Sequence, residues 1–388
     1  MLRTHRLLEA LAMRHVLTVV AFATGAQAEP PPFPVRMVEV PWDWPPLYRD
    51  MRYGNSAAAL SAYEKLVDEA AEPWIASCYE SPAMEVALRQ VTRDQFDLIL
   101  IEQSFMGRFL PTLPHEIPKL LDLQNIHTAM ARRMVDKANV DRADDERREA
   151  DRTHRFERMV ASQCATCIAV SDEDAKLARA LLGAKNVEVV PNGVDTSFFT
   201  PADYAATQPY LLYTGLMSYD PNVGAVRHFV AEVLPLIRQE INAAFHIVGA
   251  GPTEEVQALA SESVIVHGSV PDMRPYFDAA MAVVVPLLEG GGTRLKILEA
   301  AASGKAIVST SLGAEGLNLR HDEDLLIADS APEFAAAVIR LCKDAGLRWR
   351  LGQQARSASL EYDWKRIGAR FRRVVESFRQ EMSSQHGQ

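Results

Sequence analysis

Short runs of aliphatic and β-branched residues recur along the chain, and stretches with helical spacing separate them. In the second half, such runs fall at 210–214, 245–248, 264–267, 283–285 and 306–309. The run at 283–285 is wholly apolar, as expected of a strand that is buried on both faces. Strands that alternate with helices in this way predict an α/β fold with a parallel sheet. With 388 residues, the chain is long enough for two domains of ordinary size.

The stretch 283–317 is predicted to form a strand, a glycine loop, a helix and a second strand. Gly290, Gly291 and Gly292 stand in a row after the first strand, and Thr293 can cap the helix, which ends at Ser303. Glycines let a ligand approach bare backbone amides. A helix N-terminus favours an anion, because its N–H groups are unpaired and the helix dipole is positive there. The stretch therefore predicts a phosphate-binding site.

Lys296 and Glu299 on that helix are three residues apart and share a face. One interpretation is an ion pair on the solvent side, which contributes little to stability. The other interpretation puts Arg294 and Lys296 against a diphosphate and Glu299 on sugar hydroxyls. The spacing alone leaves both open.

The N-terminus also has two interpretations. Early basic residues, a short apolar run and the sequence Ala26-Gln27-Ala28 are typical of a secretory signal. Alternatively, residues 4–13 form an amphipathic helix with Leu7 and Leu11 inward, and residues 16–22 form a buried strand.

Charge and cysteine content narrow the function classes. A net charge of −10 argues against a general nucleic-acid binder. Cys164 and Cys167 form a C-x-x-C without a second pair at metal spacing, so zinc is not expected, and buried structural thiols are favoured over redox activity. Residues 136–158 are dense in charges of both signs, which predicts a long exposed helix.

The sequence GGGTRLKILEAAASGKAIVST, followed by GAEGL, resembles the donor-site segment of glycosyltransferase family 4, the retaining GT-B enzymes. The resemblance implies two Rossmann-like, doubly wound α/β domains with parallel sheets that face a cleft. Residues 1–205 would form the acceptor-side domain and 206–361 the domain that binds the nucleotide sugar. Residues 362–388, which begin with the family's YDWKRIG pattern, would form a helix that packs back on the first domain. The resemblance supports the helix-and-strand interpretation of the N-terminus. It also implies that the family's first strand and its glycine loop are missing here.

The same resemblance implies roles for individual residues. The donor's diphosphate would meet the loop and helix start at Gly290, Gly291, Gly292, Thr293, Arg294 and Lys296, of which Arg294 and Lys296 would be catalytic. Glu299 would hold the ribose, and Gly215, Gly249 and Val270 would complete the donor site. Gln124 takes the usual place of a family histidine that faces the acceptor, which makes the nearby His127 a catalytic candidate, although a structural histidine is the alternative. The sequence departs from the family where a second glutamate would stand at Gly291, and where Met217 and Asn222 replace phosphate-binding cations.

The function implied is a retaining, hexosyltransferase-type enzyme. It would move a sugar from a nucleoside diphosphate sugar to a glycan or lipid-linked acceptor, without a metal or other cofactor and without nucleic acid. Such proteins are cytoplasmic, with peripheral contact at the inner face of the membrane, and act in polysaccharide or cell-envelope biosynthesis. One rival is a catalytically inactive GT-B protein that acts as a partner or remnant. The signal-like start favours a second rival, a two-lobed periplasmic binding protein.

Overall fold

The computed structural model of the protein describes residues 2–23, 31–42, 72–137, 143–201, 210–290 and 294–385. The chain forms two compact units. The N-terminal unit comprises Met1–Val190 together with Gly368–Gln388, and the C-terminal unit comprises Pro191–Ile367. No helix in the described ranges combines the length and the apolar character that crossing a lipid bilayer requires.

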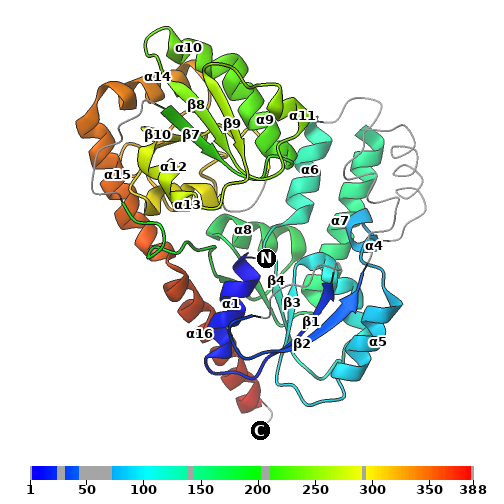
Figure 1. The fold of residues 1–388 in the computed structure, drawn as a ribbon. Coiled ribbons are helices and arrows are strands. Elements are labelled where there is room, and N and C mark those ends of the chain that lie inside the picture. The colour runs from blue at the N-terminus through cyan, green and yellow to red at the C-terminus, as the bar shows by residue number, and fades with distance from the viewer. Residues whose placement is uncertain are drawn as a thin grey trace. The chain divides into compact units, whose positions relative to one another are not determined.

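The described strands of the N-terminal unit form two parallel sheets (Figure 1). One sheet has four strands in the order β3-β4-β5-β6, and the other pairs β1 with β2. The strands are β1 (Thr18–Ala23), β2 (Arg36–Pro41), β3 (Ile99–Glu102), β4 (Lys119–Asp122), β5 (Thr166–Ala169) and β6 (Val187–Val189). The helices are α1 (Leu2–Ala12), α4 (Trp74–Ser77), α5 (Pro82–Val91), the 3-10 helix η1 (Ser104–Thr112), α6 (His127–Lys137), α7 (Ala143–Ser162), α8 (Asp172–Leu177) and the π-helix η2 (Ala178–Leu182).

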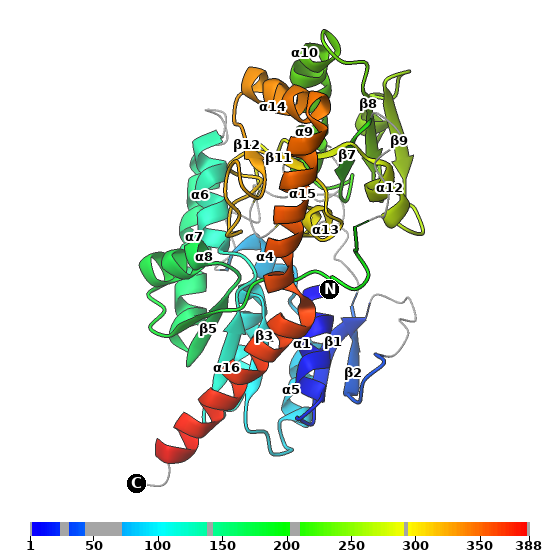
Figure 2. The same cartoon turned by 90° about the vertical axis from the view of Figure 1, so that its left-hand side faces the viewer.

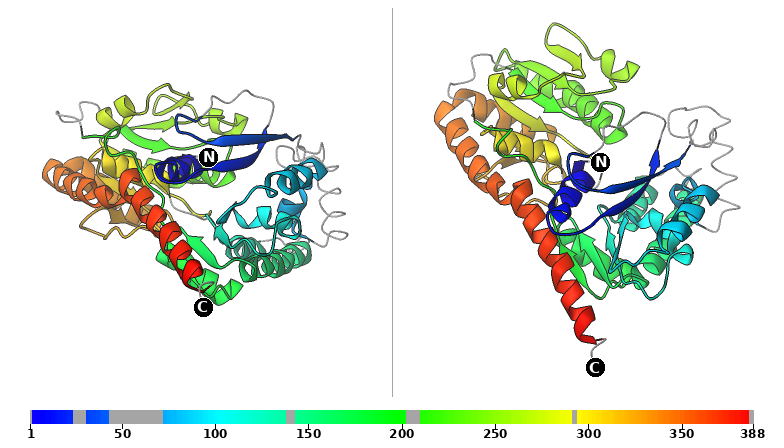
Figure 3. Two further views of the ribbon diagram at one scale, coloured as in Figure 1. Left: turned by 90° about the horizontal axis from the view of Figure 1, so that it is seen from below. Right: turned by 60° about the horizontal axis from the view of Figure 1, so that its bottom comes forward.

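Helix α1 and strand β1 occupy the start of the chain, as the helix-and-strand interpretation predicts, but the prediction of a buried strand at 16–22 is wrong, because the residues of β1 are half-buried and Val16 is exposed. Leu7 and Leu11 of α1 are buried in the unit. Helix α16 (Trp364–Gln385) lies beside α1 (Figures 2 and 3). A Cβ on Gly368 would lie 2.6 Å from the Cβ of Ala10, so a glycine here lets the two helices approach closely.

Helix α7 differs from the prediction for residues 136–158. One face of α7 is buried and carries Glu149, Arg152 and Glu157, so the exposed-helix prediction is wrong for that face. The charges are tolerated because they pair: Arg152 Nη1 donates to Glu149 Oε2 at 3.0 Å. Burial still raises the pKa of Glu149 to about 7. Residues 138–142 lie outside the described ranges.

The C-x-x-C thiols lie in the core of the N-terminal unit. Cys167 is buried in β5, and Cys164 packs against the same core. Burial raises the pKa of each thiol to about 12. Since the thiolate is the reactive form, these thiols are inert at neutral pH, and the structural interpretation is favoured.

A six-stranded parallel sheet forms the centre of the C-terminal unit, in the order β12-β11-β10-β7-β8-β9. The strands are β7 (Tyr210–Thr214), β8 (Ala244–Val248), β9 (Val264–Gly268), β10 (Ala282–Val285), β11 (Ile307–Ser309) and β12 (Leu326–Ile327). The helices are α9 (Asp220–His228), the π-helix η3 (Phe229–Val233), α10 (Leu234–Arg238), α11 (Glu254–Gln257), α12 (Arg274–Ala279), α13 (Leu295–Ala302), α14 (Ala331–Lys343), α15 (Ala345–Ser359) and the 3-10 helix η4 (Leu360–Tyr362).

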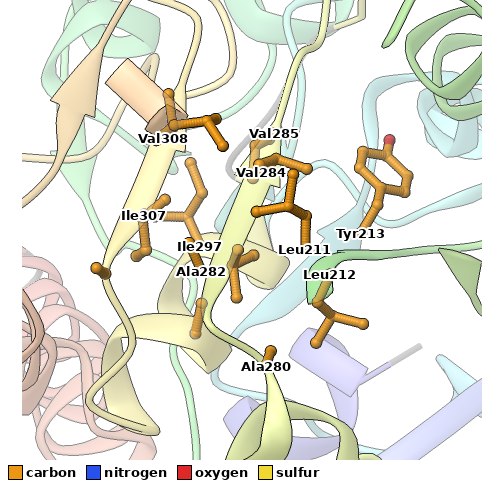
Figure 4. Packing of buried hydrophobic residues seen from close by; sticks show 14 of the residues in the cluster. Leu211, Leu212, Tyr213, Ala280, Ala282, Val284, Val285, Ile297, Ile307 and Val308 are labelled. Atoms are coloured by element: carbon orange, nitrogen blue, oxygen red, sulfur yellow. The ribbon is translucent and has the colours of Figure 1, made fainter. Parts of the chain in front are cut away.

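Apolar side chains from neighbouring strands fix this sheet. Figure 4 shows Leu211 and Leu212 of β7 together with Val284 and Val285 of β10 and Ile307 of β11. All five side chains are fully buried. Burial of each side chain contributes about 1.5–3 kcal/mol to the free energy of unfolding, relative to an exposed position. The fully buried strand predicted at 283–285 is thus confirmed. The loops that follow β7 and β10 begin at these closely packed strands.

Candidate functional site

Three glycine loops of the C-terminal unit leave the sheet at the carboxyl ends of its parallel strands. Gly215 follows β7, Gly249 follows β8 and Gly290 lies in the loop after β10. Strands β7 and β10 are neighbours, and the strand order reverses between them. Open parallel sheets bind ligands at such a reversal, because adjacent loops diverge there. This edge of the sheet is therefore the candidate ligand site of the unit.

The loops after β7 and β8 meet backbone to backbone at Gly249. A Cβ on Gly249 would lie 1.7 Å from the carbonyl oxygen of Gly215. The N–H of Gly249 donates to the carbonyl of Gly268 at 2.9 Å, and the N–H of Gly215 donates to the carbonyl of Val248 at 3.1 Å. Packing between loops thus requires glycine at this position. Contact between Gly249 and a donor stays a prediction.

Replacing Gly249 with alanine is expected to lower the free energy of unfolding of the C-terminal unit by about 3 kcal/mol or more, because a backbone oxygen has nowhere to move. Gly268→Ala is the matched control. Its φ of +68° is strained for alanine, but a Cβ there has no atom within 4 Å. The control should lose only about 1–2 kcal/mol. Urea unfolding of the two variants measures the difference, and equal losses would contradict the packing argument.

Lys296, in the first turn of α13, lies against strand β7. Its Nζ donates to Asn222 Oδ1 at 2.8 Å and lies 3.9 Å from the centre of the Tyr213 ring. The Tyr213 hydroxyl donates to the same Asn222 oxygen at 2.7 Å. A Cβ on Gly215 would lie 3.0 Å from Nζ. The ammonium group is thus held beside the loop after β7, at the reversal of strand order.

The charge of Lys296 is poorly compensated. Burial lowers the pKa of Lys296 well below its usual range, and the positive charge of Arg294 adds to this, whereas Glu299 acts in the opposite direction. Among the described residues, the hydrogen-bond partner of Nζ is the neutral Asn222, and no ion pair with Glu299 forms. The solvent-side ion pair that the spacing left open is therefore wrong. A half-buried cation with this little compensation is stabilised strongly when an anionic ligand binds.

Arg294 occupies the N-cap position of α13, so the helix begins one residue later than a Thr293 cap would place it. Its side chain is 8% exposed. A Cβ on Gly290 would lie 3.2 Å from Arg294 Nη2, and Gly290 has a φ of +113°, which residues with a Cβ rarely adopt. Two cationic side chains therefore converge with the positive end of the α13 dipole.

Gly291, Gly292 and Thr293 lie outside the described residues. Their predicted contacts with a diphosphate stay predictions.

Glu299 and Val270 complete the predicted donor site. Glu299 is half-buried on α13, where burial raises its pKa and the Lys296 charge opposes that rise. Val270 follows edge strand β9 and packs against the core of the unit. Strand β9 is two strands from β7, against which Lys296 lies, and contact of Glu299 or Val270 with a donor stays a prediction.

His127 begins helix α6 in the N-terminal unit. Its Nδ1 is 3.3 Å from Glu157 Oε1 and 3.1 Å from Ser104 Oγ, and its side chain is 20% exposed. The Glu157 carboxylate and the Ser104 hydroxyl both lie within hydrogen-bonding distance of Nδ1 and orient the ring. This is the geometry of an oriented histidine, and a catalytic role for His127 stays a prediction.

Glu157 caps helix α6 from α7. Its oxygens accept from the N–H of His127 at 3.1 Å, the N–H and hydroxyl of Thr128 at 2.7 Å each, and the hydroxyl of Ser104 at 2.8 Å. Burial acts to raise the pKa of Glu157, but the hydrogen bonds and the charge of His127, with the bonds from Thr128, outweigh it and lower the pKa. The sequence analysis missed Glu157, and no local signal marks it.

Family models match most of the chain. Residues 3–198 match the model described as Glycosyltransferase Family 4, and residues 208–344 match Glycosyl transferases group 1. The phosphatidyl-myo-inositol mannosyltransferase of Mycolicibacterium smegmatis is 28% identical over 224 residues, which cover 54% of this chain and 56% of that protein. An uncharacterised protein of the cps region of Klebsiella pneumoniae is 27% identical over 168 residues, 40% of this chain and 43% of that protein. The chain thus spans about half the length of the curated relatives it matches.

Solved structures show the fold. Sucrose-phosphate synthase from Thermosynechococcus elongatus has a TM-score of 0.71 at 18% identity, over 99% of this chain and 93% of that one. HepE from Anabaena, solved with UDP-glucose, has a TM-score of 0.66 at 14% identity, over 97% of this chain and 95% of that one. These likenesses and the two parallel-sheet α/β units confirm the GT-B fold class. Since the family model spans residues 3–198, half of the chain, the protein belongs to glycosyltransferase family 4.

Proposed function

We propose that the protein is a retaining glycosyltransferase that moves a sugar from a nucleoside diphosphate sugar to a glycan or lipid-linked acceptor. The observation that carries the proposal is the Lys296 ammonium at the start of α13, beside Arg294, with which no carboxylate of the described residues forms an ion pair. A pyrophosphate is the group that such a cationic helix start would complement.

In this proposal the C-terminal unit stabilises the departing diphosphate. Negative charge builds up on the phosphate oxygens as the sugar–oxygen bond breaks. Lys296, Arg294 and the α13 dipole would stabilise that charge. The hydroxyl of the acceptor enters on the face that the diphosphate leaves, so retention needs no protein nucleophile. Glu299 would fix the ribose, and Gly291, Gly292 and Thr293 would supply backbone amides.

The similar proteins support this proposal without naming this chain's substrates. HepE was solved with UDP-glucose, and the mycobacterial relatives are phosphatidyl-myo-inositol mannosyltransferases. A role in polysaccharide or cell-envelope assembly, at the inner face of the membrane, is consistent with those relatives and with the cps-region protein.

Isothermal titration with UDP, GDP and ADP tests the proposal. One nucleotide is expected to bind with a dissociation constant in the micromolar range, about −8 kcal/mol. The same preparation should release that nucleotide from its sugar conjugate when acceptor extract is added. Binding without turnover would instead support the inactive GT-B protein, and the absence of any nucleotide binding would reject the donor site.

A further inference from the structure

Two histidines of the C-terminal unit face each other from neighbouring strands. His246 lies in β8, and His267 lies in β9, the edge strand of the six-stranded sheet. The Nδ1 atom of His246 and the Nε2 atom of His267 are 3.2 Å apart, and both side chains are half-buried. Neither histidine belongs to the donor site predicted from the sequence, and neither has a role in the proposed transfer reaction.

A bulge in β9 sets the position of His267. In the pairing of β8 with β9, Val266 lies opposite Ile247. Gly268 is two residues further along β9, but it lies opposite Val248, the next residue of β8. His267 is therefore the extra residue of a bulge. Bulges re-aim side chains and are common next to functional sites, so the strand pairing itself sets where His267 points.

Two tyrosines hold the histidine rings from either side. The ring of Tyr210, in β7, stacks on His246 with the ring centroids 3.8 Å apart and the planes within 5° of parallel. The ring of Tyr276, in α12, meets His267 edge-on, with the centroids 4.9 Å apart. The Tyr210 hydroxyl donates to the Tyr276 carbonyl at 2.8 Å, which ties β7 to α12 (Figures 1 and 2). These contacts restrict the rotation of both histidine rings.

Both histidines are predominantly neutral at pH 7. Burial lowers the pKa of His246 to about 4, and the nearby His267 adds to this shift. Burial also lowers the pKa of His267. In the part of the chain that the structure describes, neither ring forms an ion pair with a carboxylate that would favour its protonated form. A neutral imidazole is the form that binds a metal ion.

The hydrogen bond between the two rings uses one proton. One of the facing nitrogens donates it and the other accepts it. A neutral imidazole can carry its single proton on either nitrogen. When both rings carry it on the nitrogen that faces away, His246 Nδ1 and His267 Nε2 present two lone pairs to the space between them. The pair can therefore bind a cation without losing a proton.

The separation of the two nitrogens suits a transition-metal ion. Bonds from Zn²⁺ to histidine are about 2.0–2.1 Å long, so two nitrogens on one tetrahedral ion are about 3.3 Å apart. At the right angle of a square-planar Cu²⁺ or Ni²⁺ site, bonds of that length put the nitrogens about 2.9 Å apart. The separation of 3.2 Å between His246 Nδ1 and His267 Nε2 lies between these two values. Small rotations of the rings would then let an ion take the place of the hydrogen bond.

We infer that His246 and His267 form a two-histidine site for a divalent transition-metal ion such as Cu²⁺ or Zn²⁺. Within the described ranges, no group of three or more His, Cys, Asp or Glu side chains is placed to hold a metal ion. Water would therefore complete the coordination, and the ion would exchange with solvent. Mg²⁺ and Ca²⁺ prefer oxygen ligands and are not expected here. A bound ion would join edge strand β9 to β8, and its binding is independent of the proposed glycosyl transfer.

Isothermal titration of the full chain, without an affinity tag and in a non-chelating buffer at pH 7, tests the inference. The probes are the chlorides of Cu²⁺, Zn²⁺ and Mg²⁺. Cu²⁺ is expected to bind with a dissociation constant on the order of 1 μM, and Zn²⁺ about tenfold or more weakly, because nitrogen ligands favour Cu²⁺. Mg²⁺ should give no binding heat. If neither Cu²⁺ nor Zn²⁺ binds, or if Mg²⁺ binds as tightly as Zn²⁺, the inference is overturned.

Two variants assign the ion to this pair. His267→Gln keeps a polar side chain but removes one ligand nitrogen, so it is expected to weaken Cu²⁺ binding by at least about tenfold. His115→Gln is the control, because it removes an exposed histidine of the N-terminal unit, and it should leave Cu²⁺ binding unchanged. Circular dichroism confirms that each variant is folded. If folded His267→Gln binds Cu²⁺ as tightly as the parent does, the pair is not the site.

Pulsed electron paramagnetic resonance of the parent chain loaded with one equivalent of Cu²⁺ keeps the test valid should His267→Gln fail to fold. The far nitrogen of each coordinated imidazole couples weakly to the copper electron, and combination lines in the spectrum distinguish two rings from one. The expected spectrum shows two imidazole rings on one ion. A spectrum with a single ring, or with none, would overturn the inference and leave the proposed donor site untouched.

Discussion

Replacing Lys296 with methionine is expected to lower kcat/KM by about 10²–10³-fold and to weaken nucleoside diphosphate binding by at least about tenfold. The ammonium is the group that lies 2.8 Å from Asn222 Oδ1 at the reversal of strand order, and burial lowers its pKa. A diphosphate would supply the missing negative charge. Methionine keeps the length and the apolar stem of the side chain while it removes the charge. Titration with UDP, GDP and ADP, and turnover with the matching sugar conjugate, measure the two effects.

The same substitution should leave the ligand-free chain as stable as the parent or more stable. A lysine whose folded pKa lies below its unfolded value of 10.5 destabilises the fold at neutral pH, and this penalty fades as the pH rises toward the unfolded value. The melting temperature of Lys296→Met should therefore equal or exceed that of the parent at pH 7, with a smaller difference at pH 10.

Lys343→Met is the control for Lys296→Met. Its ammonium pairs with Glu240 at the surface, and both side chains are about half exposed. Exposed pairs of this kind contribute about 1 kcal/mol at most, so nucleotide binding and stability should stay unchanged. If Lys296→Met lost binding and stability together, Lys296 would be a structural residue and the diphosphate assignment would fail.

Local sequence pattern was enough to predict the elements around Lys296. The apolar run at 283–285 has no polar alternation, and the strand there is fully buried on both faces. The helix after the glycines runs to Ala302 and ends at Ser303, where the sequence predicts its end. The N-terminal residues form an amphipathic helix, because Leu7 and Leu11 are one turn apart and face inward. In each of these cases the residues that decide the structure are neighbours in the sequence.

Contacts between distant residues could not be predicted in this way. Lys296 is 74 residues from Asn222, and the sequence indicated only that Asn222 stands where relatives carry a cation. Glu157 is 29 residues from Thr128, on a helix whose dense charges are typical of a solvent-exposed face. Charge patterns predict exposure because an unpaired buried charge is unfavourable. They fail where, as for Glu157, donors from another helix compensate the charge.

Replacing Glu157 with alanine is expected to lower the stability of the N-terminal unit by about 3–5 kcal/mol. The carboxylate accepts from the N–H groups of His127 and Thr128 and from the hydroxyls of Ser104 and Thr128. Alanine removes all of these acceptors and leaves buried donors unpaired at the start of α6, and each unpaired donor costs about 1–3 kcal/mol. Urea unfolding at pH 7 measures the loss. Hydrogen exchange of the α6 amides, which should become much faster, locates it.

Asp151→Ala is the control, because it removes a carboxylate from the exposed face of the same helix. It should change the free energy of unfolding by no more than about 0.5 kcal/mol. The pH dependence separates the two variants further. Because the folded pKa of Glu157 lies below its unfolded value of 4.5, the contribution of its charge is fully present above pH 4.5 and is lost as the pH falls through the folded pKa. The gap between the parent and Glu157→Ala should therefore be widest near pH 7 and narrow in acid. The stability difference between the parent and Glu157→Ala could instead stay constant down to pH 3, or match the difference for Asp151→Ala. Either result would show that packing of the aliphatic part of the Glu157 side chain, and not its ionised carboxylate, holds α6 in place.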